Sequence, residues 1–272
     1  MFYLNAHLEI NKVVDVVMSL SKKFLKPSVA SNQLRLLFTA AERKVNYPGH
    51  VPLSPLQRIF LVAGSAIMGL KAPWRGGDMI SVLGDASGQP FFLHRLLNKM
   101  LVDKTGREIL KDKPRMTSKS LNLPFLRTLP PNTLGKIYVD WIDKEHVGPD
   151  TRSPTRFVDD PEEAYVMQRY RESHDFYHAI CNMPTNIEGE LAIKWLEFVN
   201  MGLPVGALSA LFGPLRLNCE QASRFRRVYI PWSIRNGLNA KTLINVYWEK
   251  ELTNDIEDVR RRIRIEAAPP LV

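Results

Sequence analysis

The sequence has little cysteine and no apolar run long enough to cross a membrane. Its 272 residues include two cysteines, Cys181 and Cys219, so a disulfide framework is excluded and a reducing or otherwise non-secretory compartment fits best. The longest apolar stretch, from Ile59 to Leu70, falls short of the roughly 18 residues that a membrane-spanning helix requires. We therefore expect a buried or membrane-lying helix there, in a protein that does not span a bilayer.

Acidic residues are missing from region 16–41, although basic residues occur in it. The basic residues are Lys22, Lys23, Lys26 and Arg35. A basic, serine-containing N-terminal region without acids is typical of a mitochondrial transit peptide. Glu9 and Asp15 come before it, and an ordinary basic helix is the alternative. We therefore treat residues 1–46 as an N-terminal extension of one of these two kinds.

The chain as a whole is basic, with a formal net charge of +9, which favours acidic partners such as anionic lipid or nucleic acid. No groove-reading helix or stacking platform for nucleic acid is recognisable, so we expect no nucleic-acid partner. Arg224, Arg226 and Arg227 precede Trp232 and several aliphatic residues. Arginines beside aromatic groups suit an anionic membrane surface, where each basic residue adds about 1 kcal/mol. These four residues are the predicted membrane-facing group, and a solvated helix face is the alternative.

Strand signals are scarce and helix signals dominate. Ser54-Pro55 and Asp160-Pro161 each combine an N-capping side chain with proline in the first helical position, and each opens a helix. The sequence predicts one all-α domain over residues 47–272, with irregular segments at 112–133 and 146–157. The main helices are expected at 54–70, 134–145, 160–181, 186–202, 204–212, 218–236 and 240–265, with two or three short ones within 79–110.

Four side chains able to bind a metal lie close together in the segment SHDFYHAICNMPTNIEGEL, residues 173–191. His174, Asp175 and His178 form an HDxxH pattern, and on one helix they share an arc of about 100°. The spacing of four residues between the histidines is the one that zinc-binding HExxH helices use. Glu190 follows after eleven residues. On a continuous helix it would lie about 18 Å beyond His178.

Pro184 predicts how Glu190 reaches the other three side chains. Proline cannot continue a helix, and a short connection makes successive helices antiparallel neighbours. We therefore expect His174, Asp175, His178 and Glu190 to bind one divalent metal. Two imidazoles and two carboxylates favour Zn2+, with Fe2+ or Mn2+ as alternatives. Since Asp175 adjoins His174, one of the two could instead hold a water or support a ligand from behind.

Two other classes of metal protein do not fit these residues. A metallopeptidase needs glutamate where Asp175 stands. A di-iron bundle needs Glu-x-x-His pairs, whereas Glu172 is followed three positions later by Asp175.

Cys181 is expected to be a small buried residue and not a ligand. Lys194 falls within about 60° of Glu190 on the second helix, so it could pair with a substrate carboxylate. A solvent-exposed ladder of charges is the alternative for Lys194.

Several blocks of sequence carry a family resemblance in addition to the HDxxH-x11-Glu motif. They are GHVPLSPLQRIFLVAGSAIMGL, GDMISVLGDASG, RFVDDPEEAYVMQRYRESHDFYH, MPTNIEGELAIKWLEF, GLPVGALSALFGPLRL and LINVYWE. Together and in this order they resemble the zinc-binding coenzyme Q biosynthesis family, the fourth of the Coq proteins, over about residues 47–270. Glu188 stands where that family usually has an apolar residue.

The resemblance implies an α-helical homodimer with a hydrophobic tunnel for a polyprenyl chain. It implies peripheral attachment to the matrix face of the mitochondrial inner membrane, and organisation of the other enzymes of the coenzyme Q synthesis complex. It also implies a carboxy-lyase activity, the removal of the C1 carboxylate from a 4-hydroxy-3-methoxy-5-polyprenylbenzoate, with hydroxylation of C1 in the oxidative form. His174, Asp175, His178 and Glu190 carry over as the metal ligands.

A non-catalytic scaffold that binds polyprenyl lipid and holds a structural metal is the alternative function. The two functions differ in how many protein ligands the metal has. A structural zinc site is closed by four protein ligands, whereas a catalytic one keeps a position for water or substrate.

Overall fold

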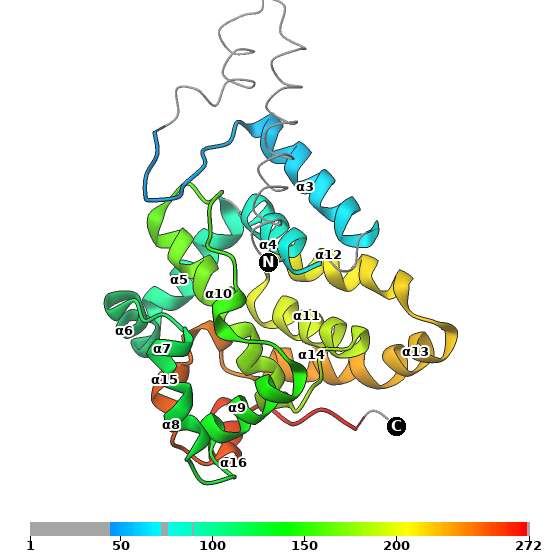
Figure 1. Cartoon of the computed structure of the whole chain (residues 1–272). Coiled ribbons are helices and arrows are strands. Elements are labelled where there is room, and N and C mark those ends of the chain that lie inside the picture. The colour runs from blue at the N-terminus through cyan, green and yellow to red at the C-terminus, as the bar shows by residue number, and fades with distance from the viewer. Residues whose placement is uncertain (1–43, 72–75, 89, 271–272) are drawn as a thin grey trace, which may run out of the picture. The chain divides into compact units, whose positions relative to one another are not determined.

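The computed structural model describes residues 44–71, 76–88 and 90–270. Within these ranges the chain forms helices and loops, with one isolated β-bridge between Thr133 and Asp255 and no strand (Figure 1). The predicted all-α class is confirmed. Of the predicted N-terminal extension, residues 1–43 lie outside the described residues. No helix in the described part is both long and apolar enough to span a bilayer.

Contacts divide the described residues into two compact units, those before residue 89 with 155–164, and 90–154 with those from 165 onward. The first unit contains α3 (Pro55–Lys71) and α4 (Gly76–Ser87), which pack against each other. The expected capping box opens α3, since the Ser54 N–H donates to Gln57 Oε1 at 2.8 Å and the Gln57 N–H donates to Ser54 Oγ at 3.2 Å. A small core lies under these helices and consists of Leu53, Leu61, Val82, Ala86 and Phe157.

The second unit holds the remaining helices and the candidate site. In chain order they are α5 (Phe91–Val102), α6 (Lys104–Asp112), α7 (Ser118–Leu121), α8 (Leu123–Arg127), α9 (Leu134–Glu145), the 3-10 turn η2 (Pro149–Thr151), α10 (Pro161–Cys181, counted with this unit from Tyr165), α11 (Ile187–Met201), α12 (Pro204–Phe212), the 3-10 turn η3 (Gly213–Arg216), α13 (Cys219–Arg224), the π-helical η4 (Phe225–Tyr229), α14 (Ile230–Asn239), the 3-10 turn η5 (Leu243–Asn245), α15 (Trp248–Glu251) and α16 (Ile256–Ile263). Helix α11 packs between α12 and α14 (Figure 1).

Aromatic side chains form the centre of this unit. Tyr138 of α9 stacks on Phe176 of α10, with ring centroids 4.1 Å apart, and Phe176 stacks in turn on Trp248 of α15 at 5.6 Å. All three residues are fully buried. This stack joins three helices, and α10 is buried on all sides from Val166 to Cys181, so the orientation of α10 is set by packing.

The prediction of one helix over 240–265 is wrong, and the buried Asn200 gives the reason. Its side-chain amide donates to the carbonyl groups of Gly237, Ala240 and Lys241 at 3.1, 3.4 and 3.2 Å, and its Oδ1 accepts the Leu243 N–H at 2.8 Å. One side chain thus satisfies backbone groups that a helix would otherwise pair. The segment 112–133 also differs from its prediction, because it contains α7 and α8.

Replacement of Asn200 by alanine removes the partners of these buried backbone groups. We expect Asn200→Ala to lower the free energy of unfolding by about 1–3 kcal/mol, since unpaired buried polar groups keep their desolvation cost. Urea denaturation followed by circular dichroism measures this change. Asn239→Ala, at an exposed position on α14, is the matched control and should stay within about 0.5 kcal/mol of the unmodified protein. Equal effects of the two substitutions would contradict the role given to Asn200.

Candidate metal centre

The two histidines of the HDxxH pattern lie one turn apart on α10. The helix begins at the predicted cap, where Asp160 Oδ1 accepts the N–H groups of Glu162 and Glu163 at 2.8 and 3.0 Å. Both imidazoles are buried, and the Nε2 atoms of His174 and His178 are 3.2 Å apart. Two ring nitrogens therefore face the same point in the protein interior.

The chain reverses direction after α10, as Pro184 predicts. Asn182 adopts a left-handed conformation with φ of 52°, and the Met183 N–H donates to the carbonyl of His178 at 2.9 Å. Asn186 caps α11 by accepting the Gly189 N–H at 2.9 Å. Helix α11 therefore starts four residues after Met183, and Glu190 lies in its first turn.

This reversal brings Glu190 to the two histidines. Its Oε2 lies 3.4 Å from His174 Nε2, and its Oε1 lies 3.7 Å from His178 Nε2. The ligand atoms of the three residues all lie within 4.8 Å of one another. The Glu190 side chain is 39% exposed, so the group can be reached from outside. The predicted meeting of Glu190 with the histidines is confirmed.

The spacing of these atoms fits a metal ion. Metal–nitrogen and metal–oxygen bonds of about 2.0–2.1 Å in a tetrahedron put neighbouring ligand atoms roughly 3.3 Å apart. The observed separations are 3.2, 3.4 and 3.7 Å. When both rings carry their proton on Nδ1, two Nε2 lone pairs face each other at 3.2 Å, and a cation bound by both atoms removes their repulsion. The residues present therefore suit a divalent cation.

The other ring nitrogens are held by acceptors. Nδ1 of His174 lies 2.6 Å from Oε1 of Glu197, and Nδ1 of His178 lies 3.1 Å from the carbonyl oxygen of Met183. Acceptors at Nδ1 keep the proton on that nitrogen, which leaves Nε2 free to bind a metal. Trp141 stacks on His178 with ring centroids 5.2 Å apart and donates its indole N–H to the same Met183 carbonyl at 2.9 Å. Both imidazoles are thus fixed in orientation.

Glu197 is the central charged group behind His174. It is 1% exposed, and its Oε2 accepts from Lys194 Nζ at 2.8 Å and from the Tyr170 hydroxyl at 2.6 Å. Burial by itself raises the pKa of Glu197, but Lys194 and His174 outweigh burial and lower the pKa to about 2. Glu197 therefore remains a carboxylate at neutral pH. Its place on the helix face of Glu190 and Lys194 could have predicted a supporting role.

Charges within the site also shift the pKa values of two candidate ligands. Burial and the charge of Lys194 lower the pKa of His174, but Glu197 and Glu190 outweigh both, so the net shift is upward. Burial raises the pKa of Glu190, whereas the charge of His178 and hydrogen bonds to both histidines bring it well below its usual range. The carboxylate of Glu190 is thus ionised and available as a ligand.

Lys194 is brought to the site, as the sequence predicts, but it already has partners. Its ammonium contacts Glu197 and lies 3.2 Å from Nδ1 of His174, and the residue is 6% exposed. The alternative of a solvent-exposed ladder is therefore wrong.

Cys181 is fully buried, as predicted for a small interior residue, and burial raises the pKa of its thiol to about 12.

Asp175 lies apart from the other three predicted ligands. Its Oδ1 accepts from Nη2 of Arg152, and its buried Oδ2 has no hydrogen-bond partner among the described residues. The structure therefore brings three of the four predicted ligands together, and metal binding by Asp175 stays a prediction. On α10 the position after His174 points toward the loop that carries Arg152.

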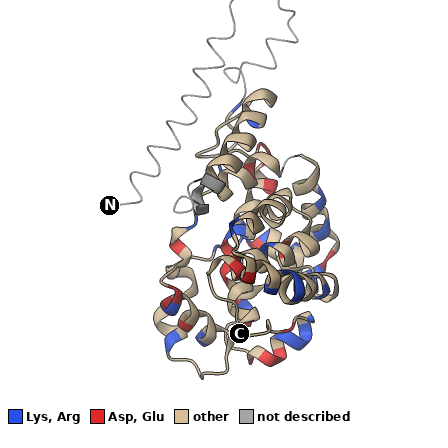
Figure 2. Cartoon of the chain, turned by 90° about the vertical axis from the view of Figure 1, so that its right-hand side faces the viewer, with Lys and Arg blue, Asp and Glu red and all other residues tan. Residues whose placement is uncertain are grey.

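The predicted membrane-facing residues have different surroundings. Trp232 is 2% exposed and donates its indole N–H to the Ala267 carbonyl at 3.2 Å, so the prediction for this residue is wrong. Arg224 pairs with the buried Glu188 at 2.9 and 2.7 Å. Arg226 and Arg227 are exposed on η4, and their membrane role stays a prediction. Figure 2 shows basic and acidic residues both present along the helices.

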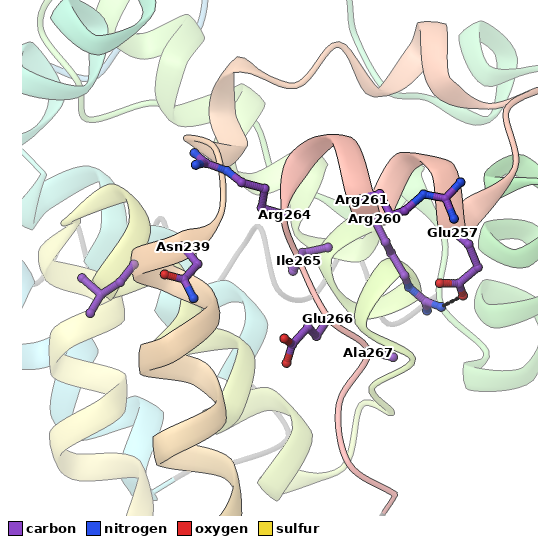
Figure 3. Close-up of a pocket in the computed structure, with 9 residues that line it drawn as sticks. Asn239, Glu257, Arg260, Arg261, Arg264, Ile265, Glu266 and Ala267 are labelled. Atoms are coloured by element: carbon purple, nitrogen blue, oxygen red, sulfur yellow. Dashed lines mark hydrogen bonds and ion pairs between the residues drawn. The ribbon is translucent and has the colours of Figure 1, made fainter.

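A pocket of about 670 Å³ lies between the end of α14 and α16, away from the candidate ligands. Figure 3 shows Glu257, Arg260 and Arg261 reaching it from α16, with Arg264 and Glu266 following in the chain. This lining is too highly charged for a polyprenyl chain. The pocket is therefore not the hydrophobic tunnel that the resemblance implies, and that tunnel stays a prediction.

The fold and the site define a helical protein in which two successive helices, α10 and α11, carry a His-His-Glu metal-binding group. The family model described as Coenzyme Q (ubiquinone) biosynthesis protein Coq4 matches residues 47–269. The chain belongs to this family, as its sequence resemblance predicts.

Curated relatives and a solved structure agree with this membership. The ubiquinone biosynthesis protein coq4, mitochondrial, of Schizosaccharomyces japonicus is 79% identical over 235 residues, which cover 86% of this chain and 98% of the relative. The ubiquinone biosynthesis protein COQ4, mitochondrial, of Coccidioides immitis is 47% identical over 266 residues, with 93% of each chain covered. A crystal structure of a candidate ubiquinone biosynthesis protein from Nostoc punctiforme has a TM-score of 0.60 at 19% identity. It covers 74% of this chain and 95% of its own, and it shows the shared fold.

Gly189 tests whether the reversal positions Glu190. A Cβ atom there would lie 2.1 Å from the carbonyl oxygen of Pro184 and 3.1 Å from Cγ of Met183, so the turn has to move. We expect Gly189→Ala to lower the free energy of unfolding by about 1–3 kcal/mol and to weaken metal binding. Chemical denaturation and calorimetric metal titration measure the two effects.

Gly64→Ala on α3 is the matched control, because a Cβ at Gly64 meets nothing within 4 Å. It should raise stability by about 0.5–1 kcal/mol through helix propensity and leave metal affinity unchanged. If the Gly189→Ala protein binds metal as tightly as the unmodified chain, the turn does not position Glu190 for metal binding.

Proposed function

We propose that this chain is a metal-dependent carboxy-lyase of ubiquinone biosynthesis, which removes the C1 carboxylate from a 4-hydroxy-3-methoxy-5-polyprenylbenzoate. The observation that supports this most is the number of converging ligands, since His174, His178 and Glu190 form a three-residue group in the described chain. Three protein ligands leave a coordination position for water or substrate, and Asp175, as the predicted fourth ligand, has to release the metal for substrate to take that position. A structural metal in a non-catalytic scaffold would be closed by a fourth protein ligand and usually by cysteine.

The donor set favours Zn2+, for which two histidines and one glutamate are a known catalytic combination. The same donors also suit Fe2+, and Mn2+ accepts carboxylate and imidazole ligands. Zinc has no redox chemistry. An oxidative reaction that hydroxylates C1 therefore requires either a redox-active metal or direct reaction of dioxygen with an electron-rich phenolate.

The residues around the metal have separate tasks in this proposal. A bound metal supplies positive charge that orients a substrate oxygen and stabilises negative charge as it develops. Glu197 and the Met183 carbonyl hold the two imidazoles in the orientation that directs Nε2 inward. The ammonium of Lys194 balances the charge of Glu197, so pairing of Lys194 with the substrate carboxylate requires it to leave that partner.

The cellular setting is part of the same proposal. Relatives from Schizosaccharomyces japonicus and Neurospora crassa are named mitochondrial. We infer a peripheral location on the matrix side of the inner mitochondrial membrane, where a substrate with a polyprenyl tail is held. There the chain would act as a homodimer that also organises other enzymes of the coenzyme Q synthesis complex.

Replacement of His174 tests the metal and the activity together. We expect His174→Ala to reduce metal affinity by roughly 100-fold or more and to abolish CO2 release, because a direct ligand is lost. Metal content after dialysis is measured by mass spectrometry, and CO2 is collected from substrate labelled in its carboxylate, with metals added back singly. The control is His146→Asn, at an exposed left-handed position that asparagine tolerates, and it should retain both properties. Full turnover by metal-free His174→Ala protein would refute the assignment.

A further inference from the structure

A buried and incompletely hydrogen-bonded polar cluster lies beside the metal-binding group. Arg152 follows η2 and donates through Nη2 to Oδ1 of Asp175, the residue next to His174 on α10. Three buried atoms of the cluster lack hydrogen-bond partners among the described residues: Nε of Arg152, Oδ2 of Asp175 and the hydroxyl of Tyr138. Unpaired polar atoms are costly in a protein interior, and three of them in one place indicate a missing polar partner.

The positive charge of Arg152 interacts with the candidate ligand Glu190 as well as with Asp175. Burial by itself lowers the pKa of Arg152, whereas Asp175, then Glu190 and then Tyr138 raise it, and the net shift is upward. The cation thus stays charged within electrostatic reach of all three groups. Its side chain is 28% exposed, so a molecule that enters from outside can meet it.

Arg152 has unused donors in a geometry that suits a carboxylate. Its guanidinium carries five N–H donors, and the bond to Asp175 is the one that it makes with described residues. The planar fork of a guanidinium binds both oxygens of a carboxylate through parallel hydrogen bonds. Lys194, by contrast, is 6% exposed and contacts both Glu197 and His174. Arg152 is therefore the cation beside the metal group that remains free to take an anionic ligand.

We infer that Arg152 binds the carboxylate of the aromatic acid substrate next to the metal centre, and that Asp175 positions its guanidinium. The identity of the acid rests on the proposed function, whereas recognition of a carboxylate rests on the cluster itself. Tyr138 completes the subsite with a hydroxyl that can donate to the same anion. Specificity for the acid over its decarboxylated product follows, because the product has no anionic group for Arg152.

The chemistry of decarboxylation determines how Arg152 contributes. The bond between C1 and the carboxylate carbon breaks, its electron pair stays on the ring, and CO2 leaves without charge. In the non-oxidative form C1 then takes up a proton. Negative charge moves away from Arg152 during this step, so its interaction is stronger with the bound substrate than with the transition state. Such an interaction lowers KM without raising kcat.

Equilibrium binding of two matched compounds tests the inference. The acid is 4-hydroxy-3-methoxy-5-prenylbenzoate, and its partner is the same prenylated methoxyphenol without the carboxylate. Arg152→Met should weaken binding of the acid by roughly 10- to 100-fold and leave binding of the phenol unchanged, because a charge-assisted pair is lost. The affinity of Arg152→Lys for the acid should lie between those of the unmodified protein and Arg152→Met. The substitution Arg216→Met, at an exposed position on η3, should change neither affinity.

Metal content and steady-state kinetics supply further measurements. The Arg152→Met protein should keep its metal and show a raised KM with kcat retained or raised, because the lost interaction is stronger in the bound substrate than in the transition state. If its fold is weakened by the unpaired Asp175, the variant Arg152→Lys keeps a cation beside Asp175, and the ratio of acid to phenol affinity is measured in that protein.

Equal weakening of both compounds, or no weakening of the acid, would overturn the role of Arg152. Either result leaves the proposed activity standing if the unmodified protein releases CO2. The reverse case is also distinguishable. Selective loss of acid binding in Arg152→Met, in a protein that releases no CO2 with any metal, would support the carboxylate subsite and remove the lyase.

Discussion

The carbonyl oxygen of Met183 is the acceptor on which the candidate site depends. It lies 3.1 Å from Nδ1 of His178 and accepts the indole N–H of Trp141 at 2.9 Å. One backbone group of the turn therefore orients a candidate metal ligand. The turn in turn determines where α11 begins. Because Glu190 lies in the first turn of α11, a small displacement here would move the carboxylate away from both histidines. The site is thus built on a short reversal between two buried helices.

Buried charges around this turn are balanced in pairs. Glu197 faces Lys194 and His174, Asp175 faces Arg152, and Glu190 faces the two histidines. Charged groups are tolerated in an interior when each has a partner of opposite sign. The network has a second effect, since it fixes the rotamers of the metal-facing side chains before any ligand arrives.

The HDxxH motif predicts the helix on which its residues lie, but not the partner of each side chain. The angular spacing of His174, Asp175 and His178 on a helix puts all three on one arc, and the structure agrees with the helix. Asp175 nevertheless pairs with Arg152, which comes from the loop at 146–157. Trp232 likewise follows a group of arginines, as a membrane-facing aromatic residue would, but packing places it in the interior. Both differences arise because the partner lies far away in the sequence, where neither periodicity nor spacing can locate it.

The sequence by itself determined the helical class, the caps at Ser54 and Asp160, and the reversal at Pro184, because each depends on backbone conformations and hydrogen bonds within a few residues. It predicted that four side chains meet, and the structure brings three of them together, since the reversal places Glu190 level with the histidines. Only the tertiary structure decided that Asn200 pairs with backbone groups where a helix over 240–265 is predicted to begin, that Glu197 supports His174, and that Arg152 pairs with Asp175. Those outcomes depend on which buried groups find partners, and that is decided when distant segments pack together.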